Sequence, residues 1–238
     1  MSVLIVVAHP DDEVLGCGGT AAGLALQGVP VHTCILSGNA DARRQHPTSP
    51  ALQAHACNAS RVLGLAEPCL GDFPNIAFNP VPHLELVRFI EERIAASGAH
   101  TIFTHHPKDL NDDHRHTSLA CQAAARLFQR RPGMKKLRGL YFVEILSSTD
   151  WAFPANGEGF RPDCFFELGT GLLDRKIAAL REYPGVMRDF PHPRSEEVLR
   201  ALAACRGGQA GMHYAEAFQT AFRGMRPSEF TEPECTGM

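Results

Sequence analysis

The chain has 238 residues, a formal net charge of −3, 44% hydrophobic residues and 21% charged residues. These values are typical of a globular protein and exclude wholesale disorder, a fibrous repeat and a coiled coil. The slightly negative charge provides no broad cationic field, so we expect no nucleic-acid partner. No apolar run approaches the roughly 18 residues of a membrane span, and no basic residue precedes Arg43, so we expect neither a span nor a secretory signal.

The eight cysteines are scattered, contain no CxxC pair and in several cases lie in apolar segments. This usage is typical of reduced, buried thiols, so we expect a cytoplasmic protein. It does not favour a cysteine-based zinc site, because structural zinc sites usually take their cysteines in close pairs. The oligomeric state is not indicated.

The N-terminal segment predicts a strand–helix–strand unit. The β-branched run Val3–Val7 lacks polar alternation, as is typical of a strand that is covered on both faces of a parallel sheet. A helix is expected over Val14–Gln27, because Gly28 gives a stop signal after it, and a second strand is expected over Val31–Leu36. Such units are right-handed and place functional loops at the carboxyl ends of the strands.

The pattern continues along the chain. We expect further strands at Thr101–Thr104, Leu140–Ile145 and Cys164–Leu168, and helices at Ala51–Leu63, Leu84–Ser97, His116–Gln129, Leu172–Tyr183 and Glu196–Cys205. The chain therefore predicts one α/β domain over 1–223, Rossmann-like, with a mostly parallel sheet flanked by helices. Residues 224–238 are expected to form a loose C-terminal tail.

Acidic residues gather directly after the first predicted strand. His9 is followed by Asp11, Asp12 and Glu13. Carboxylates this close repel one another, and a divalent cation is the commonest way to reverse that penalty. Helix capping explains one of the acids but not all of them, so we predict a metal site here.

The glycines of GCGG at 16–19 could instead indicate a dinucleotide site. Their spacing does not fit GxGxxG, and the acids at 11–13 would face the pyrophosphate. Close packing of the helix on the sheet is the better explanation of these glycines.

A second polar segment, 105–116, contains four histidines and three aspartates in twelve positions, again after a predicted strand. If the two strands are neighbours, both polar segments meet at one edge of the sheet. Catalytic zinc commonly takes three ligands from histidine and carboxylate and leaves one position for water. His9, one aspartate and one downstream histidine would provide such a set, although spacing alone does not choose among them.

Four motifs resemble the LmbE/PIG-L family of zinc-dependent N-acetyl-sugar deacetylases. They are AHPDDE at 8–13 with the following GCGG, THHPKDLNDDHR at 104–115, FPHPRS at 190–195 and AEAF at 215–218. The resemblance extends to about Phe222. It implies a Rossmann-like fold that binds Zn²⁺, or another divalent metal such as Fe²⁺, and no dinucleotide.

The resemblance also implies roles for individual residues. The metal ligands are His9, Asp12 and His114, and Asp11 is the catalytic base. Asp113, which precedes the last ligand, is expected to orient a neighbouring imidazole.

The chain departs from the family pattern at Asn111, where many members carry a histidine that stabilises the developing oxyanion. The cationic role would then pass to His105, His106 or His192, and we include His192 among the predicted catalytic residues. Residues expected to contact substrate are Arg44, Asn75, Asn111 and Arg194.

The implied activity is hydrolysis of the N-acetyl group of an N-acetylglucosamine-type amino sugar or its conjugate. Water activated by the metal would attack, with Asp11 as general base. Two alternatives remain: a zinc amidase acting on a thiol or aminoglycoside conjugate, and a non-catalytic α/β module that binds a nucleotide or nucleotide sugar. The sequence does not identify the acetamido sugar.

Overall fold

The computed structural model describes residues 1–39, 48–153 and 159–226. Its strands form one seven-stranded sheet in the order β3-β2-β1-β4-β5-β7-β6. Their bounds are β1 Val3–Val7, β2 Val31–Ile35, β3 Cys69–Leu70, β4 Thr101–His105, β5 Gly139–Val143, β6 Cys164–Glu167 and β7 Ala215–Arg223. Pairing is parallel from β3 to β5, whereas β7 runs antiparallel to both β5 and β6. The predicted α/β fold with a mostly parallel sheet is confirmed.

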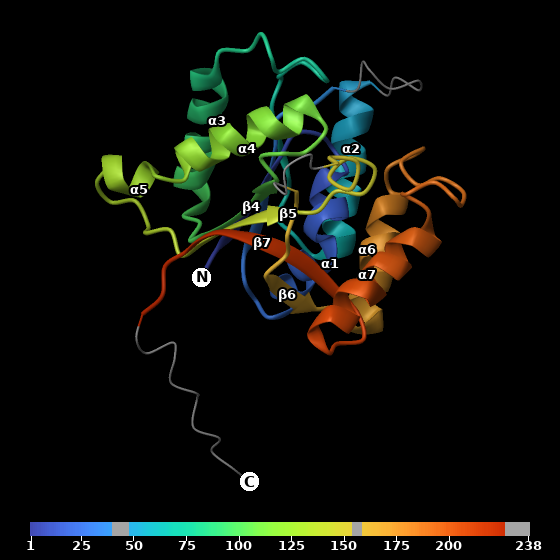
Figure 1. Cartoon of the computed structure of the whole chain (residues 1–238). Coiled ribbons are helices and arrows are strands. Elements are labelled where there is room, and N and C mark those ends of the chain that lie inside the picture. Colours follow the sequence, from blue (N-terminus) through green and yellow to red (C-terminus); the bar gives the residue numbers. More distant parts are fainter. Residues whose placement is uncertain (40–47, 154–158, 227–238) are drawn as a thin grey trace.

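Helices cover both faces of the sheet. α3 and α4 lie on one face, and α1, α2, α6 and α7 lie on the other (Figure 1). The helix bounds are α1 Asp12–Leu26, α2 Ser49–Leu63, α3 His83–Ser97, α4 Asp112–Ala124, α5 Leu127–Arg130, α6 Gly169–Arg181 and α7 Glu196–Ala210. Alternate residues of β1 enter the two cores: Val3 and Ile5 pack with the α1 layer, and Leu4 packs with the α3 layer. This two-sided burial explains the unbroken apolar run of the first strand.

One expectation needs correction, and one strand is missing from the predicted set. The helix predicted from His116 begins at Asp112, because the side chain of Asn111 accepts the Asp113 N–H at 2.9 Å and caps the helix. β7 was not predicted as a strand, and it inserts between β5 and β6. The proposed tail boundary at 224 stays a prediction, since residues 227–238 lie outside the described residues.

The cysteines in the described ranges are free thiols. Cys17, Cys34 and Cys121 are buried, and burial raises the pKa of Cys121 to about 12. Within the part of the chain that the structure describes, no helix combines the length and apolar character needed to cross a bilayer.

Candidate metal centre

The two polar segments predicted to meet do so. β1 and β4 are neighbouring parallel strands, with Val6 opposite Thr104. The acidic turn after β1 and the histidine-rich turn after β4 therefore leave the sheet at the same edge. That edge is formed by carboxyl ends of strands, where α/β proteins commonly place their sites.

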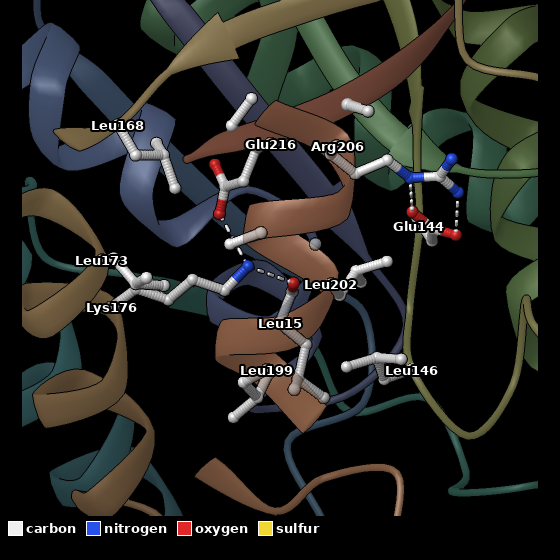
Figure 2. Close-up of a pocket in the computed structure, with 14 residues that line it drawn as sticks. Leu15, Glu144, Leu146, Leu168, Leu173, Lys176, Leu199, Leu202, Arg206 and Glu216 are labelled. Atoms are coloured by element: carbon white, nitrogen blue, oxygen red, sulfur yellow. Dashed lines mark hydrogen bonds and ion pairs between the residues drawn. The ribbon is translucent and has the colours of Figure 1, made fainter. Parts of the chain in front are cut away.

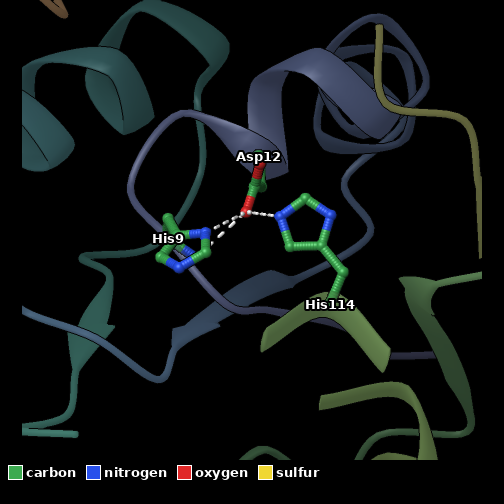
Figure 3. Close-up of side chains that lie close together, drawn as sticks. All are labelled: His9, Asp12 and His114. Atoms are coloured by element: carbon green, nitrogen blue, oxygen red, sulfur yellow. Dashed lines mark hydrogen bonds and ion pairs between the residues drawn. The ribbon is translucent and has the colours of Figure 1, made fainter. Parts of the chain in front are cut away.

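The candidate metal centre consists of His9, Asp12 and His114, whose ligand atoms all lie within 4.8 Å of one another (Figure 3). Asp12 Oδ2 lies 3.3 Å from Nδ1 of His9 and 3.2 Å from Nε2 of His114. All three side chains are buried. Two imidazole nitrogens and one carboxylate oxygen directed at one point are a suitable donor set for a divalent transition metal.

The second nitrogen of each imidazole contacts a further carboxylate. His9 Nε2 lies 2.9 Å from Asp113 Oδ2, and His114 Nδ1 lies 3.2 Å from Asp109 Oδ1. Asp113 is anchored in turn by the backbone N–H of Phe78 at 2.9 Å. Such outer carboxylates orient metal-binding histidines and select the tautomer that leaves the inner nitrogen free to coordinate.

Asp109 is not among the residues predicted from the sequence. It accepts hydrogen bonds from the hydroxyls of Ser148 and Thr149, the latter at 2.7 Å. Two signals could have identified it. It is an acid inside the histidine-rich segment, and the hydroxyl run at 147–149 follows β5, the neighbour of β4.

The protonation states of Asp12 and His114 depend on burial and on the charges that surround each group. Burial alone would raise the pKa of Asp12, but His114 and the other imidazoles hold that pKa well below its usual range. Burial disfavours charged His114, yet Asp12 and Asp109 outweigh it and raise the pKa of His114 to about 10. Without a metal, a proton on His114 therefore compensates the carboxylates.

A cavity of about 360 Å³ opens over the metal centre. It is lined by His9, Asp11, Asp12, Asn75, Ile76, Leu110, Asn111, His114, Ser147, Ser148 and Arg194. Three of the four predicted substrate contacts are thus on its wall: Asn75, Asn111 and Arg194. The fourth, Arg44, lies outside the described residues.

Asp11 occupies an unusual backbone conformation at the cavity wall, with φ 103°. Its N–H donates to Glu13 Oε2 at 3.0 Å, and Tyr183 Oη donates to the other oxygen of Glu13 at 2.5 Å. Glu13 lies outside the cavity lining, and burial raises its pKa to about 8. The third acid of the turn thus holds the backbone of Asp11 in place.

None of the three histidines considered for the oxyanion role lines this cavity. His105 is fully buried, stacks on His114 with ring centroids 3.8 Å apart, and accepts the Ala8 N–H. Burial and the neighbouring His114 lower the pKa of His105 to about 3, so it stays neutral. His106 packs edge-on against two phenylalanines, and Nδ1 of His192 accepts the Arg194 N–H at 3.0 Å.

Arg194 is the one lysine or arginine among the described residues that line the cavity. Its Nη1 lies 3.7 Å from Asp11 Oδ2. Its Nε donates to Ser147 Oγ at 2.9 Å, which fixes the guanidinium at the wall. Outside the residues of the candidate metal centre, the cation on this wall is therefore supplied by arginine, two residues after His192.

The glycines at 16–19 have the packing role expected of them. A Cβ on Gly16 would lie 2.7 Å from Val143 Cγ2 of β5, and one on Gly19 would lie 2.8 Å from Leu168. The glycines therefore allow α1 to approach the sheet, and with it the turn that carries Asp12.

α1 is interrupted at Cys17, whose φ and ψ are −152° and 22°. Lys176 Nζ donates to Leu15 O on one side of the break and to Glu216 Oε1, both at 2.7 Å (Figure 2). Glu216 accepts backbone N–H groups on the other side, from Gly19 at 3.0 Å and from the next residue at 2.7 Å. This buried pair satisfies the backbone groups released by the break.

The PIG-L family model, described as GlcNAc-PI de-N-acetylase, matches residues 4–125. Comparison with curated proteins found no match. Among solved structures, the conserved protein TT1542 from Thermus thermophilus has a TM-score of 0.75 at 24% identity, covering 94% of this chain and 96% of that one.

Two further solved structures are those of proteins with a named activity. GalB, the 4-carboxy-2-hydroxymuconate hydratase from Pseudomonas putida KT2440, has a TM-score of 0.73 at 25% identity and covers 94% of this chain and 98% of its own. The N,N'-diacetylchitobiose deacetylase from Pyrococcus horikoshii has a TM-score of 0.71 at 19% identity, with 92% and 83% covered. The family match spans more than half of the chain and includes all three residues of the candidate metal centre. The chain belongs to the PIG-L family.

Proposed function

We propose that the protein is a metal-dependent N-deacetylase that acts on an N-acetylglucosamine-type amino sugar or its conjugate. The observation that carries this proposal is the single cavity wall on which the His9, Asp12 and His114 cluster meets the carboxylate of Asp11 and the guanidinium of Arg194. Membership of the PIG-L family supports the reaction class.

His9, Asp12 and His114 would hold the metal, which we propose to be Zn²⁺, with Fe²⁺ as the alternative. When bound, such an ion supplies Lewis acidity and lowers the pKa of water. The residues fit the ion because each imidazole has its outer nitrogen engaged by a carboxylate and its inner nitrogen directed at Asp12.

Asp11 acts as the general base in this proposal. It removes a proton from the attacking water as the water oxygen adds to the acetyl carbonyl, and it returns a proton to the departing amine. The products are acetate and a free amino sugar. The Glu13–Tyr183 contact holds the backbone of Asp11 so that its carboxylate stays at the wall.

We propose that Arg194 stabilises the negative charge that develops on the carbonyl oxygen. Its bond to Ser147 holds the guanidinium before the reaction begins, so little reorganisation is needed. Asn111 uses its oxygen to cap α4, which leaves its amide nitrogen as the donor for a sugar hydroxyl. Ile76 and Leu110 line the same cavity and provide apolar surface for the sugar ring.

The test combines metal quantification with acetate release. Purified protein is assayed on free, nucleotide-linked, thiol-linked and glycosidically linked acetamido sugars, and the same panel is run with Asp11→Asn. We expect stoichiometric metal in both proteins and turnover about 10² to 10⁴-fold lower in the variant. Absence of acetate from every compound, or undiminished turnover in Asp11→Asn, would contradict the proposal.

A second candidate function is hydration of an unsaturated carboxylic acid. GalB is described as a hydratase and is 25% identical to this chain over nearly its whole length. Arg194 at the cavity wall could also bind a substrate carboxylate. This candidate would be favoured over deacetylation if the protein removed the ultraviolet absorbance of 4-carboxy-2-hydroxymuconate and released no acetate from any of the acetamido sugars.

A further inference from the structure

A second, larger cavity of about 660 Å³ lies at the opposite edge of the sheet. It is lined by Met1, His100, Thr101, Lys135, Lys136, Arg138, Tyr141, Arg223, Gly224 and Arg226, which we call the basic cavity. These residues lie near the amino ends of β1, β4 and β5 and at or beyond the carboxyl end of β7. β4 is five residues long, so at about 3.3 Å per residue the basic cavity and the metal centre are separated by roughly the length of that strand.

The basic cavity concentrates positive charge in a chain whose net charge is −3. Five of its lining residues are lysine or arginine, and none of the lining residues is aspartate or glutamate. Like charges gathered in one concavity repel one another, and a bound anion removes that repulsion. The volume is within the usual range of small-molecule pockets.

Part of this surface is held rigidly. Arg138 Nε donates to the carbonyl oxygen of Gly224 at 3.1 Å, and the Gly224 N–H donates back to the Arg138 carbonyl at 2.9 Å. These two bonds join the start of β5 to the end of β7. The guanidinium is therefore positioned before any ligand arrives, which reduces the entropic cost of binding.

His100, which also lines the basic cavity, has a ring nitrogen without a hydrogen-bond partner among the described residues. This nitrogen, Nδ1, is buried. Burial, the N-terminal ammonium group and the nearby charges of Lys135 and Arg138 lower the pKa of His100. A buried nitrogen without a partner is costly, and the imidazole that carries it lines the basic cavity.

We propose that the basic cavity binds a small anion that carries two or more negative charges, of the phosphate-ester or diphosphate class. Arginine and lysine together favour phosphate oxygens over a single carboxylate, because they provide several donors and more than one positive charge. The site is distinct from the metal centre, and it does not depend on the proposed deacetylase activity.

The test is isothermal titration calorimetry at constant ionic strength, with pyrophosphate, UDP, inorganic phosphate and acetate as probes. We expect saturable binding of pyrophosphate and UDP, weaker binding of inorganic phosphate, and none of acetate. Tighter binding of UDP than of pyrophosphate would indicate a nucleotide ligand, and equal binding would indicate recognition of the diphosphate alone. Both results support the proposal.

Variants locate the site. The double change Lys135→Glu with Lys136→Glu, and separately Arg223→Glu, are expected to weaken pyrophosphate binding about tenfold or more, since each replaces attraction by repulsion. Arg88→Glu, which alters an exposed cation of α3, is the matched control and should bind as wild type does. Thermal unfolding of each variant verifies that it is folded.

Two outcomes would overturn the proposal. One is the absence of saturable pyrophosphate and UDP binding to wild-type protein. The other is an equal loss in Arg88→Glu, which would indicate non-specific attraction to the whole surface. Retention of pyrophosphate binding by Asp11→Asn, whatever its turnover, separates this result from the fate of the proposed deacetylase.

Discussion

Two buried carboxylates, Glu216 beside α1 and Asp12 at its start, are neutralised by different kinds of group. Glu216 is paired with the ammonium group of Lys176, a cation that belongs to the chain itself (Figure 2). Asp12 is surrounded instead by the imidazoles of His9 and His114 (Figure 3). A lysine ammonium group has donors but no free lone pair, so it neutralises the carboxylate without binding a metal. An imidazole can exchange its proton for a metal ion. The difference explains why one cluster is a structural support and the other is a candidate for chemistry.

The largest expected effect is in His114→Ala. Removing one of three ligands should abolish stoichiometric metal binding and lower turnover by roughly a thousandfold or more. Metal analysis and acetate release measure the two effects. His116→Ala, in the next histidine of the same helix, is the matched control and should keep both. Full metal occupancy in His114→Ala would show that our ligand set is wrong.

Lys176→Met tests the other cluster. It leaves the Glu216 carboxylate buried without its cation, so we expect the free energy of unfolding to fall by about 3–5 kcal/mol. Urea denaturation measures this, and adding Glu216→Gln should recover part of the loss. Lys136→Met, on an exposed lysine, should change the free energy by less than about 0.5 kcal/mol. The metal content of folded Lys176→Met should equal that of wild type, and a large decrease would contradict the distinction between the clusters.

Asp109→Asn tests whether the carboxylate that faces His114 Nδ1 supports metal binding. The amide keeps the shape but removes the charge that faces His114 Nδ1, so metal affinity should fall about 10 to 100-fold. Competition with a chelator measures the affinity. Asp112→Asn changes an exposed acid of the same segment and should leave the affinity unaltered. Equal affinities in both variants would remove Asp109 from the site.

The smallest and most gradual effect is a pH dependence of the metal-free protein. The pKa of His114 is about 10 in the fold against an ordinary 6.5, so the protonated form stabilises the fold. That contribution is complete below about pH 6.5 and is lost as the pH rises through about 10. We expect wild type to lose its stability advantage over His114→Gln across this window in chemical denaturation. A constant difference would show that His114 carries no proton in the metal-free fold.

The sequence predicted much of the fold because its signals are local. The uninterrupted Val3–Val7 run and the following acidic turn indicated a buried central strand with a metal site at its end. The strand is buried, and the candidate metal centre lies at its end. β7 was not predicted because it is defined by its pairing with β5 and β6, and that pairing depends on the tertiary structure. Asp109 was missed because it shares the histidine-rich segment with the exposed Asp112, and the approach of Ser148 from the segment after β5 is what separates the two aspartates.

Residue type and spacing by themselves determined the fold class, the edge of the sheet that carries the candidate metal centre and the kind of ligand atoms present there. These properties depend on hydrophobic patterning and on side-chain chemistry, and both can be read from short segments of the sequence. Only the tertiary structure decided which histidines reach Asp12, that arginine is the cation on the cavity wall, and that cations from distant segments share one cavity. Such choices depend on distances between segments far apart in the chain, and packing alone sets those distances.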